Sequence, residues 1–246
     1  MVRSLSTAAR AWVGAFVVVS VVLLVARLAG ADVVGEVAQW LAMPTLAGVL
    51  LSVARWPRGR LVNLVAIALG LSWLGDLLPS FAGEQAFLVM VGCFLAAQIV
   101  YVVAFTPYVR RSVVHRRPVA LVAYGAVLVG LVALCAPHAG GLLLPVAVYG
   151  GCLVSMAVLA TGLGRTAGIG AAVFVVSDSL IALEQFVPGW HLPGQDFWVM
   201  LTYLAGQALL TAAVLQHNLA ERKAPPVPLR LAVPQAAKRD NVTVLV

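Results

Sequence analysis

The chain has 246 residues, of which 62% are hydrophobic and only 10% are charged, and its mean hydropathy is +1.01. Soluble globular domains carry nearer a quarter charged residues, so this composition excludes a soluble enzyme or a soluble binding module. The apolar runs are continuous rather than alternating, which argues against membrane-spanning strands. The composition therefore predicts an all-α, polytopic membrane protein.

Eight apolar runs are long enough to cross a bilayer, since about 20 residues are needed for each crossing. They cover residues 11–29, 34–54, 61–80, 86–106, 118–136, 141–162, 168–187 and 197–217. The first run follows a basic start but has no clear cleavage site of small residues after it. We therefore expect a retained first helix and a transmembrane domain of eight helices over residues 1–217.

Basic residues test this topology. With eight crossings, every Lys and Arg except Arg27 falls on one side of the membrane. The positive-inside rule makes that side cytoplasmic, with both termini inside, as in a plasma or inner membrane. The net charge of +7 then reflects contact with anionic inner-leaflet lipid, and it does not indicate a nucleic-acid partner.

The two halves of the chain resemble each other. Pro44 and Pro145 are 101 residues apart, and Asp76 and Asp178 are 102 residues apart. This spacing predicts two parallel four-helix units, about 11–106 and 118–217, related by an axis along the membrane normal. Residues 218–246 are basic and rich in Pro, which predicts a disordered cytoplasmic tail.

Two acidic residues interrupt the apolar runs, Asp76 in the third and Asp178 in the seventh. An ionisable side chain inside a membrane costs at least a few kcal/mol, so each is a candidate functional residue. Apart from Arg27, near the end of the first run, no Lys or Arg lies within a predicted span, so neither aspartate has an evident ionic partner. Two carboxyls that face each other can divide the roles of acid and base.

Several other polar residues lie in the same runs. They are Ser72, Gln98, Tyr101, Tyr149, Ser155, Ser177, Tyr203 and Gln207. Lipid offers polar atoms no partners, so we expect these side chains to line one polar interior shared with the two aspartates, where they would bind substrate. The alternative for each of them is a hydrogen bond that merely joins two helices.

Motifs for cofactors and metals are lacking in the sequence. The three cysteines and four histidines have no metal-ligand spacing, and no Walker loop, G-x-S-x-G elbow or H-E-x-x-H motif occurs. We therefore expect chemistry that needs neither a cofactor nor a metal. The sequence leaves the oligomeric state open.

Three groups of residues, in order along the chain, resemble the signatures of the YhhN-type lysoplasmalogenases. They are Ser72, Gly75, Asp76, Leu78, Phe94–Tyr101 and Phe105; then Tyr149, Ser155, Met156 and Ala160; then Gly170, Ala171, Phe174, Ser177, Asp178, Ser179, Ala182, Tyr203 and Gln207. The resemblance implies an eight-helix membrane hydrolase that acts on lysophospholipids of the lysoplasmalogen type. It would cleave their vinyl ether bond, releasing a fatty aldehyde and a glycerophospho-alcohol, with Asp76 and Asp178 as the catalytic pair.

This chain departs from the family pattern at two positions. Met43 stands where the family usually has Lys, and Gln98 stands where it favours His. Two alternatives therefore stay open beside an enzyme. One is a proton-coupled transporter of small molecules or lipids, with the aspartates as a proton relay, and the other is a non-catalytic relative that binds lipid.

Overall fold

The computed structural model describes residues 6–54 and 56–223, which are helical and contain no strand. The long helices are α1 (Thr7–Ala29), α2 (Asp32–Val53), α3 (Arg60–Leu77), α4 (Ala86–Phe105), α6 (Ala120–Ala139), α7 (Leu143–Ala160), α8 (Arg165–Phe186) and α9 (Gln195–Lys223). The shorter helical elements are η2 (Leu78–Phe81), η3 (Gly83–Gln85), η4 (Thr106–Arg111), α5 (Val113–Arg116), η5 (Gly140–Leu142) and η6 (Thr161–Leu163). The predicted all-α class is confirmed.

Local sequence signals set the limits of α1. The Ser6 side chain accepts a hydrogen bond from the backbone N–H of Ala9 and caps the start of the helix. Gly30 follows the last residue with φ of 67°, a left-handed conformation that glycine adopts without strain. Arg27 therefore lies in the last turn of α1, with only two residues between it and the turn into α2.

Seven helical segments are long and apolar enough to cross a membrane, which agrees with an integral membrane protein. One of the seven, Ala120–Leu163, includes both α6 and α7, which meet at Gly140. The count of eight crossings stays a prediction for this reason, and so does the two-fold repeat.

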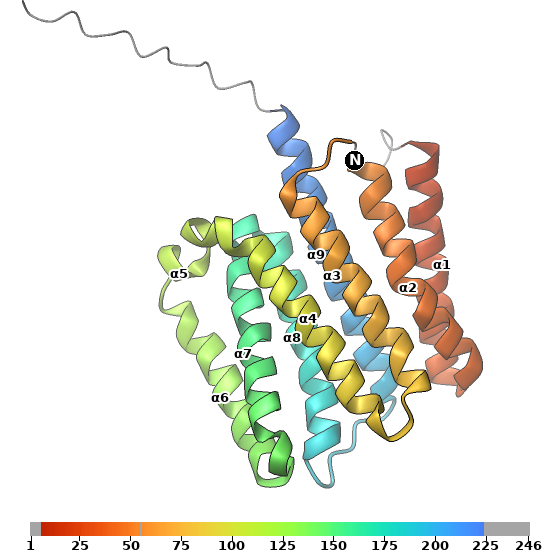
Figure 1. Cartoon of the computed structure of the whole chain (residues 1–246), viewed down its shortest axis with the longest axis vertical. Helices are drawn as coiled ribbons and strands as arrows, with labels where there is room; N and C mark the ends of the chain where they lie inside the picture. The colour runs from red at the N-terminus through yellow and green to blue at the C-terminus, as the bar shows by residue number, and fades with distance from the viewer. Residues whose placement is uncertain (1–5, 55, 224–246) are drawn as a thin grey trace, which may run out of the picture.

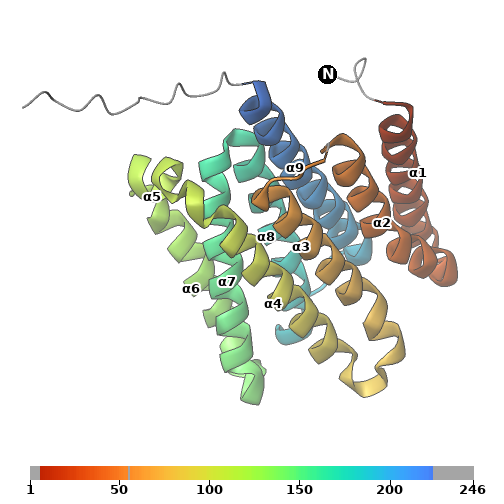
Figure 2. The ribbon, with the colours of Figure 1, turned by 45° about the horizontal axis from the view of Figure 1, so that its top comes forward.

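The helices form a bundle with α1 and α6 at its opposite edges (Figures 1 and 2). α1 packs against α2, α3 against α4, and α8 against α9, with α8 and α9 behind α3 and α4 in the view of Figure 1. α9 also contacts α1, α2 and α3. Because α9 contacts α8 as well as α1, α2 and α3, its polar side chains can reach residues from both halves of the chain.

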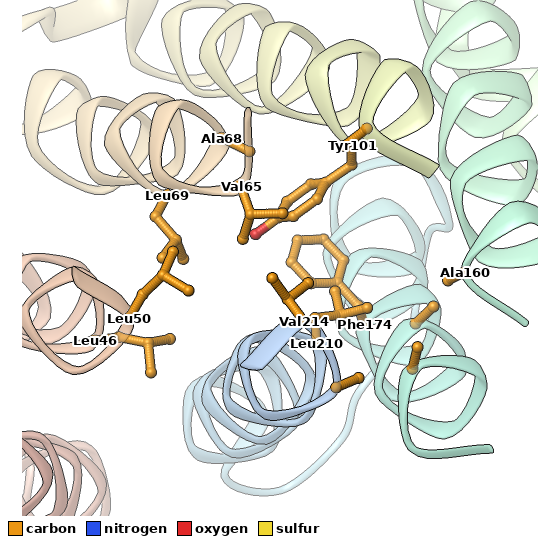
Figure 3. Close-up of a cluster of buried hydrophobic side chains, with 14 of the residues drawn as sticks. Leu46, Leu50, Val65, Ala68, Leu69, Tyr101, Ala160, Phe174, Leu210 and Val214 are labelled. Carbon is orange, nitrogen blue, oxygen red and sulfur yellow. The ribbon is translucent and has the colours of Figure 1, made fainter. Parts of the chain in front are cut away.

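Apolar side chains fill the space between α2, α3, α4, α8 and α9 (Figure 3). Tyr101 projects from α4 toward Val65 of α3, and Phe174 of α8 lies close to its ring. Leu46 and Leu50 of α2 close the same core from the other side. This core fixes the relative positions of the helices that hold the polar residues described below.

A close backbone approach joins α8 to α9. A Cβ atom added at Gly206 would come within 3.0 Å of the Gly170 carbonyl oxygen and 3.1 Å of Phe174. Small residues allow helix backbones in membranes to approach in this way. The crossing sets the position of Tyr203 and Gln207, which lie within one turn of Gly206.

The end of α9 differs from the prediction. The helix continues to Lys223, so residues 218–223 belong to it and not to a disordered tail, and Asn218 is buried. Residues 224–246, to which the rest of that prediction applies, lie outside the described residues. α1 begins and α9 ends at the same end of the bundle (Figure 1). Which side of the membrane this end faces stays a prediction.

Candidate active site

Asp76 lies in the last turn of α3 and is 5% exposed. Both of its carboxyl oxygens accept a hydrogen bond. The Tyr203 hydroxyl of α9 donates to Oδ2 at 2.8 Å, and the Gln39 amide of α2 donates to Oδ1 at 3.1 Å. The carboxyl is therefore held by two other helices at once.

Arg27 of α1 extends this arrangement. Its guanidinium Nη2 donates to Oε1 of Gln39 at 2.7 Å, so that Gln39 lies between Arg27 and Asp76. Neither Arg27 nor Gln39 was among the residues that the sequence singled out as a site. Arg27 was noted as the one basic residue out of place, but nothing in the sequence indicated that Gln39 would join it to Asp76.

A second group of polar side chains lies beside Asp76. Gln207 of α9 donates from Nε2 to the Ser72 hydroxyl of α3 at 3.2 Å. Its Oε1 accepts a hydrogen bond of 2.7 Å from the Tyr101 hydroxyl of α4. All three side chains are fully buried or nearly so. They join α3, α4 and α9 one helical turn before Asp76 on α3.

Asp178 has different surroundings. It lies in the middle of α8, and its Oδ2 accepts a hydrogen bond of 2.5 Å from the Tyr149 hydroxyl of α7. This is the one hydrogen bond that the Asp178 carboxyl forms with the described residues.

An apolar pocket reaches Asp178. Its volume is about 700 Å³, including the space open to the outside, and its polar wall groups come from Asp178 and Tyr149. The remaining wall is almost entirely hydrophobic and comes from α4, α6, α7 and α8. Phe186, which also lines the pocket, lies eight residues after Asp178, about 12 Å along α8. A pocket of this composition fits a hydrocarbon chain with a reactive group near the carboxyl.

Asp76 and Asp178 do not both line this pocket. Asp76 is not among its lining residues. Phe94 lines the pocket, packs against Gly75 on the other side, and meets the Tyr203 ring edge to face at 5.7 Å. Tyr203 lies within electrostatic reach of both carboxyls. The Phe94 ring thus contacts both the pocket that Asp178 borders and the turn of α3 that carries Asp76, while a polar interior shared by both aspartates stays a prediction.

Gln98 of α4 is fully buried, and neither polar atom of its amide has a hydrogen-bond partner among the described residues. It lies next to the Tyr149 hydroxyl. A buried amide without partners costs about 1–3 kcal/mol for each unpaired group, so such groups in native proteins usually meet a water or a ligand. Gln98 is the side chain best placed to hold a small polar molecule near Asp178.

Two predicted site residues have other positions. Ser177 donates to the backbone carbonyl oxygen of Val199 at 3.0 Å and so joins α8 to α9. Ser155 is exposed on the outer surface of α7. Leu153, two residues before Ser155 on α7, lines the pocket. Ser155 therefore does not line the pocket, and Ser177 joins two helices; a role for either in substrate binding stays a prediction.

Metal ligands do not come together in residues 6–54 and 56–223, where no group of three or more His, Cys, Asp or Glu side chains could hold an ion. Met43 of α2, at the position where the family usually has Lys, is fully buried in the hydrophobic core. The titratable groups of the site are thus the two aspartates with their tyrosines, together with Arg27.

Comparison with known proteins places these residues in context. The model of the YhhN family matches residues 36–214. A lysoplasmalogenase of Rattus norvegicus, TMEM86B, is 33% identical over 175 residues, which are 70% of this chain and 70% of that protein. A lysoplasmalogenase of Mycobacterium bovis is 31% identical over 211 residues, 82% of this chain and 80% of that protein. No solved structure matches with similar significance. The match covers α3 to α8 and both aspartates, and this chain belongs to the YhhN family.

Proposed function

We propose that the protein is a membrane lysoplasmalogenase, an ether hydrolase that cleaves the vinyl ether bond of a lysoplasmalogen-type lysophospholipid. The curated relatives named lysoplasmalogenase support the activity. One structural observation carries the proposal for this chain: a buried carboxyl, Asp178, lies on the wall of a long apolar pocket within the membrane domain. A single-chain lipid could place its hydrocarbon there and its vinyl ether beside the carboxyl.

The chemistry begins with transfer of a proton to carbon. A vinyl ether accepts a proton at the carbon β to its oxygen, and the positive charge then spreads over the α carbon and the oxygen. We assign this proton to Asp178, because an apolar pocket favours the neutral form of a carboxyl over its charged form. The hydrogen bond from Tyr149 would hold the carboxyl in position during the transfer.

Water then adds to the α carbon and loses a proton. We assign the acceptance of that proton to Asp76, which lies outside the pocket and would receive it through a bridging water or through the Tyr203 hydroxyl that donates to it. Donors face both oxygens of Asp76, which is the arrangement that a carboxylate needs. The hemiacetal then breaks its bond from the α carbon to the ether oxygen, which gives a fatty aldehyde and a glycerophospho-alcohol. This division between an acid and a base resembles that in glycoside hydrolysis.

Gln98 and the group of Ser72, Tyr101 and Gln207 complete the proposal. Gln98 has a free donor and a free acceptor beside Tyr149, and it would hold the attacking water. The other three side chains satisfy one another, so we propose that they hold α3, α4 and α9 in register around Asp76 and do not bind substrate themselves.

The test is to incubate the purified protein, reconstituted in lipid, with a lysoplasmalogen in heavy water. We expect free aldehyde that carries one deuterium at the carbon next to the carbonyl, because that carbon receives the solvent-derived proton. A saturated ether analogue of the same chain length serves as the control and should give no aldehyde.

The outcomes separate the remaining functions. Aldehyde without deuterium at that carbon would exclude carbon protonation and with it the role of Asp178. Tight lipid binding without aldehyde would instead support a non-catalytic relative. Uptake of the lipid into proteoliposomes driven by a proton gradient, again without aldehyde, would support a transporter.

A further inference from the structure

Arg27 is a basic residue in an unusual place. It lies in the last turn of α1, it is half-buried, and its Nε has no hydrogen-bond partner among residues 6–54 and 56–223. Gly35 of α2 lies against its side chain, since a Cβ there would be 3.4 Å from Nε. Arg27 also precedes residues 36–214, which the family model matches, so membership of the family assigns it no role.

The hydrogen bonds fix the direction of the Gln39 amide. A guanidinium has only donors, so the group that faces Arg27 must be the Gln39 oxygen. The amide nitrogen then points the other way and donates to Asp76. A rotation of the amide by 180° would turn donor against donor at Arg27 and acceptor against acceptor at Asp76. The Arg27 guanidinium therefore fixes the amide orientation in which Gln39 donates a hydrogen bond to Asp76.

We propose that Arg27 is a positioning residue for the hydrolysis, which acts through Gln39 to hold the Asp76 carboxyl in the orientation in which it accepts a proton. This inference rests on the proposed function of Asp76 as the proton acceptor. Arg27 and Asp76 make no direct ion pair, so the cation supports the carboxylate without neutralising it by contact. Asp178 accepts a hydrogen bond from Tyr149, and no charged side chain among the described residues is linked to it through that bond.

The experiment compares variants of the full-length protein in lipid, with kcat and KM measured for lysoplasmalogen cleavage. In Arg27→Met the Gln39 amide is free to rotate, and we expect kcat to fall about tenfold, the effect of one hydrogen bond to a charged group. KM should not change, because the pocket lies elsewhere. In Arg27→Lys one donor and the charge remain, and we expect most of kcat to return.

Gln39→Glu distinguishes positioning from a purely structural role. A glutamate would still accept a hydrogen bond from Arg27 and would hold α1 to α2 at least as well, but an ionised glutamate has no donor for Asp76. We expect kcat to fall at least as far as in Arg27→Met, because the glutamate removes the donor and also places a second carboxyl beside Asp76. Arg58→Met is the matched control, since Arg58 donates to backbone oxygens at the other end of α2.

Each outcome decides the matter. If Gln39→Glu keeps full kcat while Arg27→Met lowers only the melting temperature, Arg27 is structural and the inference is wrong. An active wild type with equal kcat in Arg27→Met contradicts this inference alone. A wild type that releases no aldehyde contradicts the proposed function, and this inference falls with it.

Discussion

Asp76 and Asp178 both interrupt an apolar helix, but the hydrogen-bond partners and the surroundings of the two carboxyls differ. Asp76 receives donors on both oxygens and is joined through them to α1, α2 and α9. Asp178 receives one hydrogen bond, from Tyr149, and otherwise borders an apolar pocket. Both carboxyls are buried, so burial does not distinguish them. The number of donors does, and it supports the proposed roles of Asp76 as proton acceptor and Asp178 as acid.

The tyrosine partners show where this asymmetry arises. Tyr149 comes from the same half of the chain as Asp178, whereas Tyr203 reaches Asp76 from the other half. If the two halves arose by duplication, the aspartates would keep their place in the helices while their neighbours diverged. Equivalent residues would thereby have acquired unequal roles.

The largest expected effect is that of Asp178→Asn, which removes the proposed acid. We expect kcat to fall by about 10³-fold, within the range for loss of a general acid. Asp196→Asn, at an exposed aspartate in the first turn of α9, is the control and should behave as the wild type. Aldehyde release measured in lipid gives the comparison. Turnover by Asp178→Asn at even a tenth of the normal rate would contradict the assignment.

Asp76→Asn should have a smaller effect, about 10²-fold on kcat, because water can still capture the cation without a base. The variant presents an amide to the donors of Gln39 and Tyr203 and so loses the charge but keeps the shape. Asp76→Asn and Asp178→Asn are compared with the same substrate preparation. A loss from Asp76→Asn greater than that from Asp178→Asn would reverse the two roles.

Tyr149→Phe and Tyr203→Phe each remove one hydroxyl and form a matched pair. We expect Tyr149→Phe to lower kcat about 30-fold and Tyr203→Phe about fivefold, because Asp178 would keep no hydrogen bond to the described residues whereas Asp76 would keep Gln39. Steady-state kinetics of both variants, with circular dichroism to check folding, measures the difference. Equal losses would mean that the two carboxyls are supported alike.

The smallest effect concerns the pocket. Ala182→Phe would fill part of it, and we expect KM to rise about fivefold for a long-chain substrate and less for a short-chain one, since each buried methylene contributes about 0.8 kcal/mol. Ala172→Phe adds the same side chain on the exposed face of α8 and serves as the control. An unchanged KM for every chain length would place the hydrocarbon elsewhere.

The sequence predicted the fold class and the helices well, because long apolar runs and short basic loops leave few alternatives. It could also single out Asp76 and Asp178, since an acid within an apolar run is conspicuous. It could not predict the link from Arg27 through Gln39, because Gln39 lies eight residues into α2 and its partners are known only once the helices pack. For the same reason it could not predict that Ser155 lies on the exposed side of α7, away from the pocket.

The exposed wall of the pocket affects how the rate of hydrolysis should depend on substrate concentration. Leu88, on the pocket wall, is 46% exposed on the surface of the membrane domain, and we therefore expect a lipid substrate to enter sideways through the bilayer. Encounter then takes place in two dimensions. Dilution of the substrate with inert phospholipid should slow the reaction even when its amount per volume of suspension is constant, and the aldehyde, once formed, would remain in the leaflet where its parent lipid was found.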